Sequence, residues 1–123
     1  MSTISEIAHD LVARCQRFDF AGAMDAHYHP DIESVEGDGS MPGAGRVRGV
    51  QACKDKGAYW QSAHEVHSMQ TFGPYLGDGA FSVVYDMDVT VKATGQRMQG
   101  REVAYYRVQD GKIVYENFMS APM

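Results

Sequence analysis

The apolar residues at the start of the chain recur with helical spacing. They fall every three or four positions along one face, a pattern typical of an amphipathic helix. The residues on this face are Ile4, Ile7, Ala8, Leu11, Val12, Cys15 and Phe18. Thr3 and Glu6 fit a capping box, in which each side chain accepts a backbone N–H of the other residue. The pattern therefore predicts a first helix that begins after Thr3.

Shorter elements follow this helix. Asp19 can cap a second helix, which Pro30 ends. The inner face of this helix carries Phe20, Met24 and His27 or Tyr28. We expect a short strand over 32–36, an exposed and mobile loop over the glycine-rich residues 37–45, and a third helix over 50–62.

From residue 64 onward apolar and polar residues alternate, which is the period of a half-buried strand. The clearest apolar face consists of Phe81, Val83, Tyr85, Met87, Val89 and Val91. Residues 93–96 and 109–111 have the composition of tight turns, and Gly111 suits a hairpin. Strands are therefore predicted over 81–92, 97–108 and 112–120.

This order of helices and strands predicts an α+β fold. Helices followed by an antiparallel meander make a strongly curved, mostly antiparallel sheet wrapped around three N-terminal helices, with a cone-shaped pocket between the layers. No internal repeat or linker interrupts the chain, so we expect residues 1–123 to form a single domain.

The last two strands are apolar on both faces. In the first of these strands Ala104, Tyr106 and Val108 lie on one face, and Val103 and Tyr105 on the other. In the second, Ile113, Tyr115 and Met119 lie on one face, and Val114 and Phe118 on the other. A sheet with a solvated back does not need this pattern. We therefore expect one face to line the pocket and a second subunit to cover the other, giving a homodimer.

Composition and charge exclude several classes of partner. The net charge is −5 and the basic residues 46–48 form the largest basic cluster, so a nucleic-acid partner is disfavoured. No apolar run is long enough to span a bilayer, and the first residues lack the basic-then-apolar order of a secretory signal. Cys15 and Cys53 fall in predicted helices and are interpreted as reduced thiols. A cytoplasmic protein that does not bind membranes is expected.

Glu36 is the carboxylate best placed to enter the predicted pocket. Two interpretations are open: it is a solvated residue at the rim, or it is held between Tyr28 and an apolar wall. In the second case the aromatic side chains of Trp60, Tyr85 and Phe118 remove water from the carboxylate. Glu36 would then be a usable base for proton transfer.

Glu102 and Glu116 share the strand parity of neighbouring apolar residues and could both point inward. One of them, held protonated in an apolar pocket, could donate a hydrogen bond to a developing oxyanion. Alternatively, Glu102 pairs with Arg101 or Arg97, or a bulge changes the parity. We favour the pairing or the bulge over an inward direction for Glu102, and Glu116 stays undecided.

The order of elements, ending in the turn at residues 110–113, resembles the nuclear transport factor 2-like superfamily, and within it the ketosteroid-isomerase-like and SnoaL-like (polyketide cyclase) branches. The resemblance covers nearly the whole chain. It implies an apolar pocket on the concave side and a dimer through the convex side. Tyr28, followed eight residues later by Glu36, resembles the pocket tyrosine and general base of the isomerases. Tyr59 and Trp60 resemble an aromatic pair that closes one pocket wall.

The resemblance stops at the oxyanion hole. The isomerases use a tyrosine late in the first helix and a protonated aspartate on the penultimate strand, where this chain has Cys15 and Ala104. A thiol is a weak hydrogen-bond donor and alanine is none. The histidine-bearing pattern of the polyketide cyclases is not matched either, so the resemblance does not imply a particular reaction.

Histidine and glycine patterns do not predict a metal or a nucleotide. His64 and His67 face opposite sides of a strand and do not form the HExxH zinc motif. The glycines of residues 37–45 lack the GxGxxG spacing of a dinucleotide site. Asp86 and Asp88 are expected on the solvated or interface side of the sheet. We therefore expect no metal and no cofactor.

Two functions remain open. In the first, a cofactor-free enzyme isomerises, cyclises or dehydrates a small apolar carbonyl compound. Glu36 is the base, with Tyr28 and optionally Tyr106 or Glu116 as hydrogen-bond partners. In the second, the pocket only binds a small molecule, or the domain is a dimeric interaction module. The side chains expected to contact the ligand are Cys15, Tyr59, Trp60, Tyr85, Met87, Glu102, Tyr106, Glu116 and Phe118.

Overall fold

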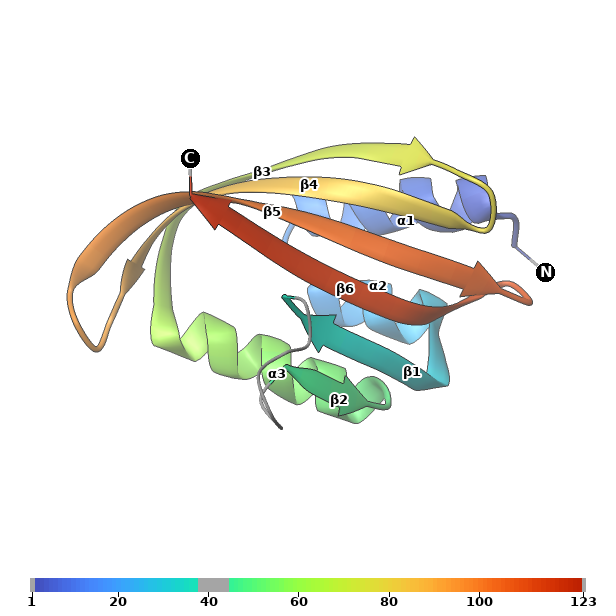
Figure 1. Cartoon of the computed structure of the whole chain (residues 1–123), viewed down its shortest axis with the longest axis horizontal. Helices are drawn as coiled ribbons and strands as arrows, with labels where there is room; N and C mark the ends of the chain where they lie inside the picture. Colours follow the sequence, from blue (N-terminus) through green and yellow to red (C-terminus); the bar gives the residue numbers. More distant parts are fainter. Residues whose placement is uncertain (1, 38–44, 123) are drawn as a thin grey trace.

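The computed structural model describes residues 2–37 and 45–122, and most of the predicted loop at 37–45 lies outside these ranges. Within them the elements are α1 Ile4–Gln16, α2 Phe20–His27, β1 Tyr28–Glu36, β2 Arg46–Arg48, α3 Val50–Ala63, β3 His64–Leu76, β4 Ala80–Val91, β5 Gln96–Gln109 and β6 Lys112–Pro122 (Figure 1). None of the helices in this part of the chain is long and apolar enough to cross a membrane.

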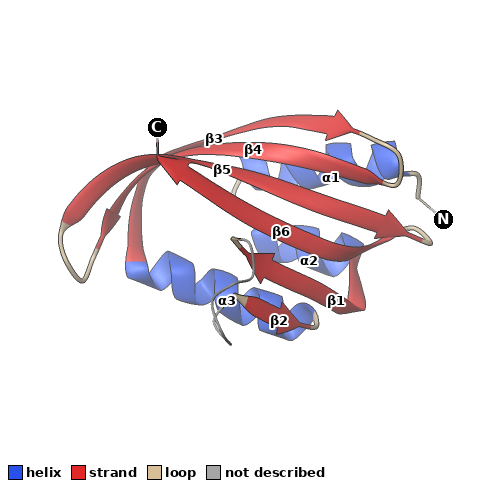
Figure 2. Ribbon diagram, viewed as in Figure 1, coloured by secondary structure: helices blue, strands red, loops and turns tan. Residues whose placement is uncertain are grey.

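The strands form one curved, open sheet in the order β2-β1-β6-β5-β4-β3. Neighbouring strands are antiparallel except for β1 and β6, which run parallel. The helices lie against this sheet, with α1 packed on β3 and β4 and α3 in contact with β1 and β3 (Figure 2). The predicted α+β fold is confirmed.

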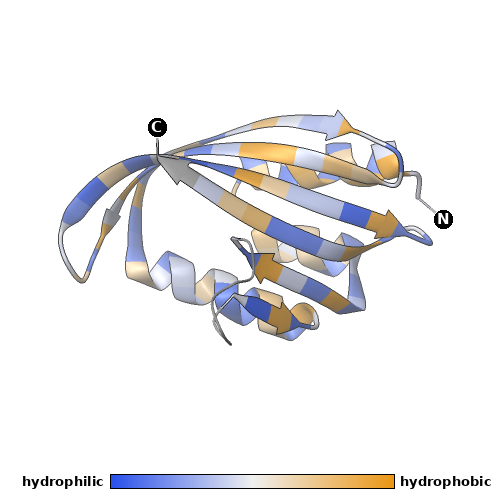
Figure 3. Ribbon diagram, viewed as in Figure 1, coloured by the Kyte–Doolittle hydropathy of each residue, from blue (hydrophilic) through white to orange (hydrophobic). Residues whose placement is uncertain are grey.

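Local sequence patterns account for the helices and the meander. The predicted capping box is present, since Thr3 Oγ1 accepts from the Glu6 amide at 3.2 Å and Glu6 Oε1 accepts from the Thr3 amide at 3.0 Å. Hydrophobic and hydrophilic bands alternate along the long strands, as the period of two requires (Figure 3). In β4 this alternation buries Phe81, Val83 and Tyr85 against the helices.

The region around Pro30 differs from the prediction. The second helix already ends at His27, and Tyr28 begins a strand of nine residues rather than the predicted five. Pro30 is tolerated there because the pairing of β1 with β6 is interrupted between Tyr28 and Glu33, so its missing N–H is not needed. The short strand β2, which pairs with β1 around Ser34, was not predicted.

A bulge in β6 changes the predicted faces of that strand. Val108 pairs with Ile113, but Arg107 pairs with Tyr115, so β6 carries one extra residue, Val114. As a result Ile113 is fully buried in the core, whereas Tyr115 lies on the outer face beside Tyr105. The prediction that Ile113 and Tyr115 share a face is therefore wrong.

Candidate functional site

The strand register brings polar side chains together on the concave face of the sheet. One row of paired residues contains Ser34, Glu116 and Tyr106, on β1, β6 and β5. The next row contains Glu36 and Phe118, and Glu102 lies one row further along β5. Since side chains two residues apart share a face, these residues all point toward the helices.

Glu116 is the deeply buried carboxyl group of this face, with only 1% of its surface exposed. Its Oε1 accepts a hydrogen bond from the Tyr28 hydroxyl, and its Oε2 accepts one from Ser34 Oγ at 2.6 Å. Burial raises the pKa of Glu116 above its ordinary value, although these two hydrogen bonds act in the opposite direction. The buried network therefore holds a carboxyl group that favours its neutral form more than a solvated glutamate does.

Lys56, on α3, connects this network to Glu36. Its Nζ donates to Ser34 Oγ and lies 3.0 Å from Glu36 Oε1. The same ammonium lies 5.1 Å from the centre of the Phe118 ring. The Lys56 side chain is 23% exposed and that of Glu36 is 43% exposed, so both can be reached from solvent.

The structure corrects the predicted surroundings of Glu36. Tyr28 and Glu36 begin and end β1, and eight residues of extended chain span roughly 25 Å. Tyr28 therefore bonds to Glu116 rather than approaching Glu36. Glu36 instead forms an ion pair at the open end of the same face and keeps contact with water.

Glu102 is partly buried on the concave face and accepts a hydrogen bond from Ser120 Oγ at 3.2 Å. Desolvation, followed by the negative charge of Glu36, raises the pKa of Glu102 to about 7. The favoured pairing of Glu102 with Arg101 or Arg97 is wrong.

The two arginines point to the other face of the sheet, as the alternation of side chains requires. Arg101 Nε lies 2.7 Å from Asp86 Oδ1, and Arg97 Nη2 lies 2.8 Å from Asp88 Oδ2. The predicted position of both aspartates on the back of the sheet is confirmed.

Further along the concave face, three residues predicted to contact the ligand form hydrogen bonds with one another in the core. They are Cys15, Tyr85 and Tyr106. Tyr85 donates to Cys15 Sγ at 3.6 Å and shares a hydrogen bond of 3.0 Å with the Tyr106 hydroxyl. Tyr106 also stacks on Phe81, with 4.9 Å between ring centres. Burial raises the pKa of Cys15 to about 11 and the pKa values of both tyrosines well above their ordinary value. Together with the fully buried Ala104, these side chains fill this part of the interior.

The predicted aromatic wall is only partly formed. Trp60 is partly buried and stacks on His64 with 4.5 Å between ring centres, but Tyr59 is 75% exposed. Adjacent residues in a helix point about 100° apart, so the two rings cannot face the same side. Phe118 and Met87 are partly buried and pack against the core, which leaves them available as apolar walls.

The histidines have separate partners. His27 Nε2 lies 2.6 Å from Asp10 Oδ2, His64 Nδ1 lies 2.8 Å from the Trp60 carbonyl, and His67 Nε2 lies 2.7 Å from Thr90 Oγ1. Within residues 2–37 and 45–122 no three histidine, cysteine or acidic side chains are grouped so that they could hold a metal ion.

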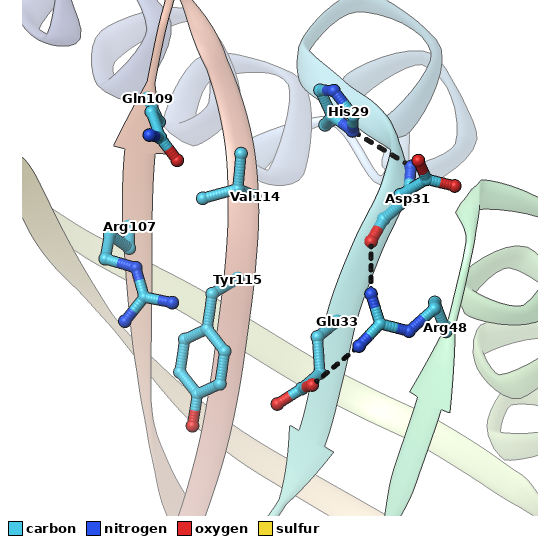
Figure 4. Close-up of a pocket in the computed structure, with 8 residues that line it drawn as sticks. All are labelled: His29, Asp31, Glu33, Arg48, Arg107, Gln109, Val114 and Tyr115. Carbon is cyan, nitrogen blue, oxygen red and sulfur yellow. Dashed lines mark hydrogen bonds and ion pairs between the residues drawn. The ribbon is translucent and has the colours of Figure 1, made fainter.

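A hollow of about 380 Å³ opens on the outer face, where β1 departs from β6 (Figure 4). Its residues are His29, Asp31, Glu33, Arg48, Arg107, Gln109, Val114 and Tyr115. Arg48 Nη2 lies 3.2 Å from Glu33 Oε2, and the guanidinium of Arg107 lies over the Tyr115 ring at 4.8 Å. The charges in this hollow are of both signs, and Arg48 pairs with Glu33. The hollow lies on the opposite face of the sheet from Glu116.

Ser34 and Lys56, which contact Glu116 and Glu36 on the concave face, were not predicted as site residues from the sequence. Ser34 could have been found, because it lies on the same face of the predicted strand as Ile32 and Glu36. Lys56 lies three residues after the buried Cys53 and therefore near the inner face of α3. Neither residue type suggests a site by itself, since both are usually exposed.

Comparisons with known proteins agree with this fold. The family model of the SnoaL-like domain matches residues 1–120. A Mesorhizobium loti protein, provisionally named a SnoaL-like polyketide cyclase, is 39% identical with a TM-score of 0.87; the match covers 95% of this chain and 98% of the other. A nuclear transport factor 2-like protein from Burkholderia thailandensis is 24% identical with a TM-score of 0.82, covering 98% of this chain and 92% of that one.

A more distant structure, TerC co-crystallised with polyporic acid, is 18% identical with a TM-score of 0.70. That match covers 95% of this chain and 90% of TerC. A comparison with curated proteins gave no match.

Proposed function

Because this chain belongs to the SnoaL-like domain family, we propose that its concave face binds a small carbonyl compound and catalyses a proton transfer on it without a cofactor. The reaction would be an isomerisation, a cyclisation or a dehydration. The observation that carries the proposal is the group of Glu36, Glu102 and Glu116 around a single lysine at one end of this face. Carboxyl groups with different surroundings can serve as acid and base in one site.

Glu36 and Glu102 have complementary roles in this proposal. Glu36 is accessible, so its carboxylate can remove a proton from the carbon next to the carbonyl group. Burial raises the pKa of Glu102 to about 7, so its protonated form is available near neutral pH. In that form it donates a hydrogen bond to the carbonyl oxygen while negative charge develops there. The proton held by Glu36 then returns to a different atom of the product, which completes an isomerisation.

Apolar and aromatic side chains next to these carboxyl groups support a largely apolar ligand. Phe118 contacts Lys56 and lies 6.1 Å from Tyr106, edge to face. Trp60 and Met87 offer further partly buried surface. The provisional cyclase name of the Mesorhizobium loti protein and the polyporic acid co-crystallised with TerC agree with a ligand of this class.

The proposal is tested by measuring exchange of carbon-bound hydrogen. We would incubate the protein with 2-tetralone in deuterated buffer and follow loss of the α-proton signals by NMR. Glu36→Gln should lower the exchange rate by at least a hundredfold, because it keeps the shape and removes the base. Glu65→Gln, at an exposed position on β3, serves as the matched control. Exchange no faster than in buffer across a panel of ketones, or full activity of Glu36→Gln, would contradict the proposal.

A second candidate function is ligand binding or dimerisation without catalysis. It is favoured by Cys15 and Ala104, which supply no strong hydrogen-bond donor where the isomerases have one. It is also favoured by the partly buried apolar side chains on the outer face, including Val103, Tyr105 and Tyr115. We propose that a second copy of the chain covers this face. A standard interface buries roughly 800 Å² per partner, enough to cover these residues.

A further inference from the structure

The ammonium group of Lys56 has hydrogen-bonding capacity left over in the part of the chain that the structure describes. An ammonium group has three N–H donors and no acceptor. One donor is directed to Ser34 Oγ. The ammonium group also forms an ion pair with Glu36, with 3.0 Å between Nζ and Oε1. Among the side chains described, those of residues 2–37 and 45–120, the ammonium group has no further oxygen partner, and the nearby Phe118 ring offers only the face of a π system.

The position of this ammonium group is restricted by a buried hydrogen-bond network. Ser34 Oγ accepts a hydrogen bond from Lys56 Nζ and donates one to the buried Glu116, which also accepts one from the Tyr28 hydroxyl. A flexible lysine normally loses conformational freedom when it binds a ligand. Here the buried network has already restricted the side chain, which makes Lys56 a preorganised cation at the open end of the concave face.

We propose that Lys56 binds an anionic oxygen of the ligand, so that the substrate class is a planar carbonyl compound carrying an ionised enolic, phenolic or carboxylic oxygen. This inference rests on the proposed function in one respect, namely that ligands bind at the concave face. A planar ligand would place its ring against Phe118 and its charged oxygen against Nζ. The hydrogen bond between an ammonium group and an anionic oxygen is among the stronger ones in proteins.

The neighbouring carboxyl groups make this binding depend on pH. The charged groups near Glu102 are Glu36 on β1, Lys56 on α3 and Glu116 on β6. Ser120 on β6 donates a hydrogen bond to Glu102, and the residue paired with it on β4 is the buried Tyr85. An anion placed beside Lys56 adds negative charge to this group and favours the protonated form of Glu102. Binding should therefore take up a proton, and affinity should fall as the pH rises above about 7.

The test uses two ligands of nearly the same shape. 2-Hydroxy-1,4-naphthoquinone is an anion at neutral pH, whereas 2-methoxy-1,4-naphthoquinone is neutral, and binding of each is measured by isothermal titration calorimetry. The anion should bind at least tenfold more tightly to the wild type. Lys56→Met should remove this difference, and Lys56→Arg should retain most of it. Lys92→Met, which removes an exposed lysine after β4, is the matched control and should behave as wild type.

Further measurements separate this inference from the proposed function. Equal affinity of the wild type for both quinones, no detectable binding of either, or unchanged anion binding by Lys56→Met overturns the role of Lys56. The comparison of the two quinones on the wild type remains decisive even if Lys56→Met does not fold. Lys56-dependent anion binding without any Glu36-dependent exchange would defeat the proposed catalysis and leave this inference standing. Glu102→Gln should abolish the pH dependence of anion binding, and persistence of that dependence would refute the proton uptake.

Discussion

The raised pKa of Glu102 makes a sharp prediction about stability. In the folded protein this pKa is about 7, against an ordinary value of 4.5. Between these two values Glu102 binds more protons in the folded state than in the unfolded state, so its contribution to the stability falls as the pH rises through this range. Below pH 4.5 both states are protonated and the burial of Glu102 has no such cost.

The size of the effect follows from the same two values. At 1.36 kcal/mol per pKa unit, the difference amounts to about 3 kcal/mol once the pH lies well above 7. Because part of the side chain still contacts solvent, we expect roughly 2 to 3 kcal/mol. Glu102→Gln replaces the carboxyl group by a neutral group of nearly the same shape. The variant should therefore match the wild type at pH 4 and be more stable by this amount at pH 9.

The measurement is urea denaturation of both proteins at pH 4, 7 and 9, with the free energy of unfolding extrapolated to water. Glu65→Gln is the control, since Glu65 is exposed on β3 and its replacement should not produce a pH-dependent difference. A stability difference for Glu102→Gln that is the same at pH 4 and pH 9 would refute the reasoning. NMR titration of the Glu102 side chain gives an independent value of its pKa.

Three further predictions concern other parts of the fold. Tyr28→Phe removes one of the two hydrogen-bond donors to the buried Glu116 and should lower the free energy of unfolding by about 1 to 3 kcal/mol. Tyr59→Phe, which changes an exposed ring, should have no measurable effect. Equal losses of stability in the two variants would contradict the network. Tyr105→Glu should convert the proposed dimer to a monomer in sedimentation equilibrium, and a wild type that is monomeric at micromolar concentration would defeat the dimer. Thr3→Ala should lower stability by about 1 kcal/mol through loss of the capping box, and an unchanged thermal midpoint would show that this cap contributes nothing.

The sequence alone was sufficient for elements whose formation depends on neighbouring residues. The first helix is specified by apolar residues at helical spacing and by the reciprocal cap of Thr3 and Glu6, all within a few residues of one another. The long strands of the meander follow from a period of two and from glycine at the turns. Strand parity allowed an inward direction for Glu102 and Glu116 but did not decide it, because an arginine partner or a bulge was an equally local alternative.

What the sequence could not supply depends on pairing between distant parts of the chain. The break in register between β1 and β6, and the extra residue at Val114, decide which side chains meet across the sheet. These irregularities place Glu116, 88 residues from Tyr28, beside its hydroxyl group. A pattern read along the chain instead suggested Glu36, which is near in sequence but about eight strand residues away in space.

The same distinction applies to charge. Whether a carboxyl group is desolvated is not a property of glutamate but of what surrounds it after folding. The sequence places each of the three glutamates in a strand, but the register of β1, β6 and β5 brings them to one face. Only the packing of α3 against β1 brings Lys56 to Ser34 and Glu36, while Glu116 is buried beneath them. The catalytic role of Glu36 stays a prediction, whereas the partner of each carboxyl group was decided by tertiary contacts, because burial and ion pairing arise only when distant segments pack together.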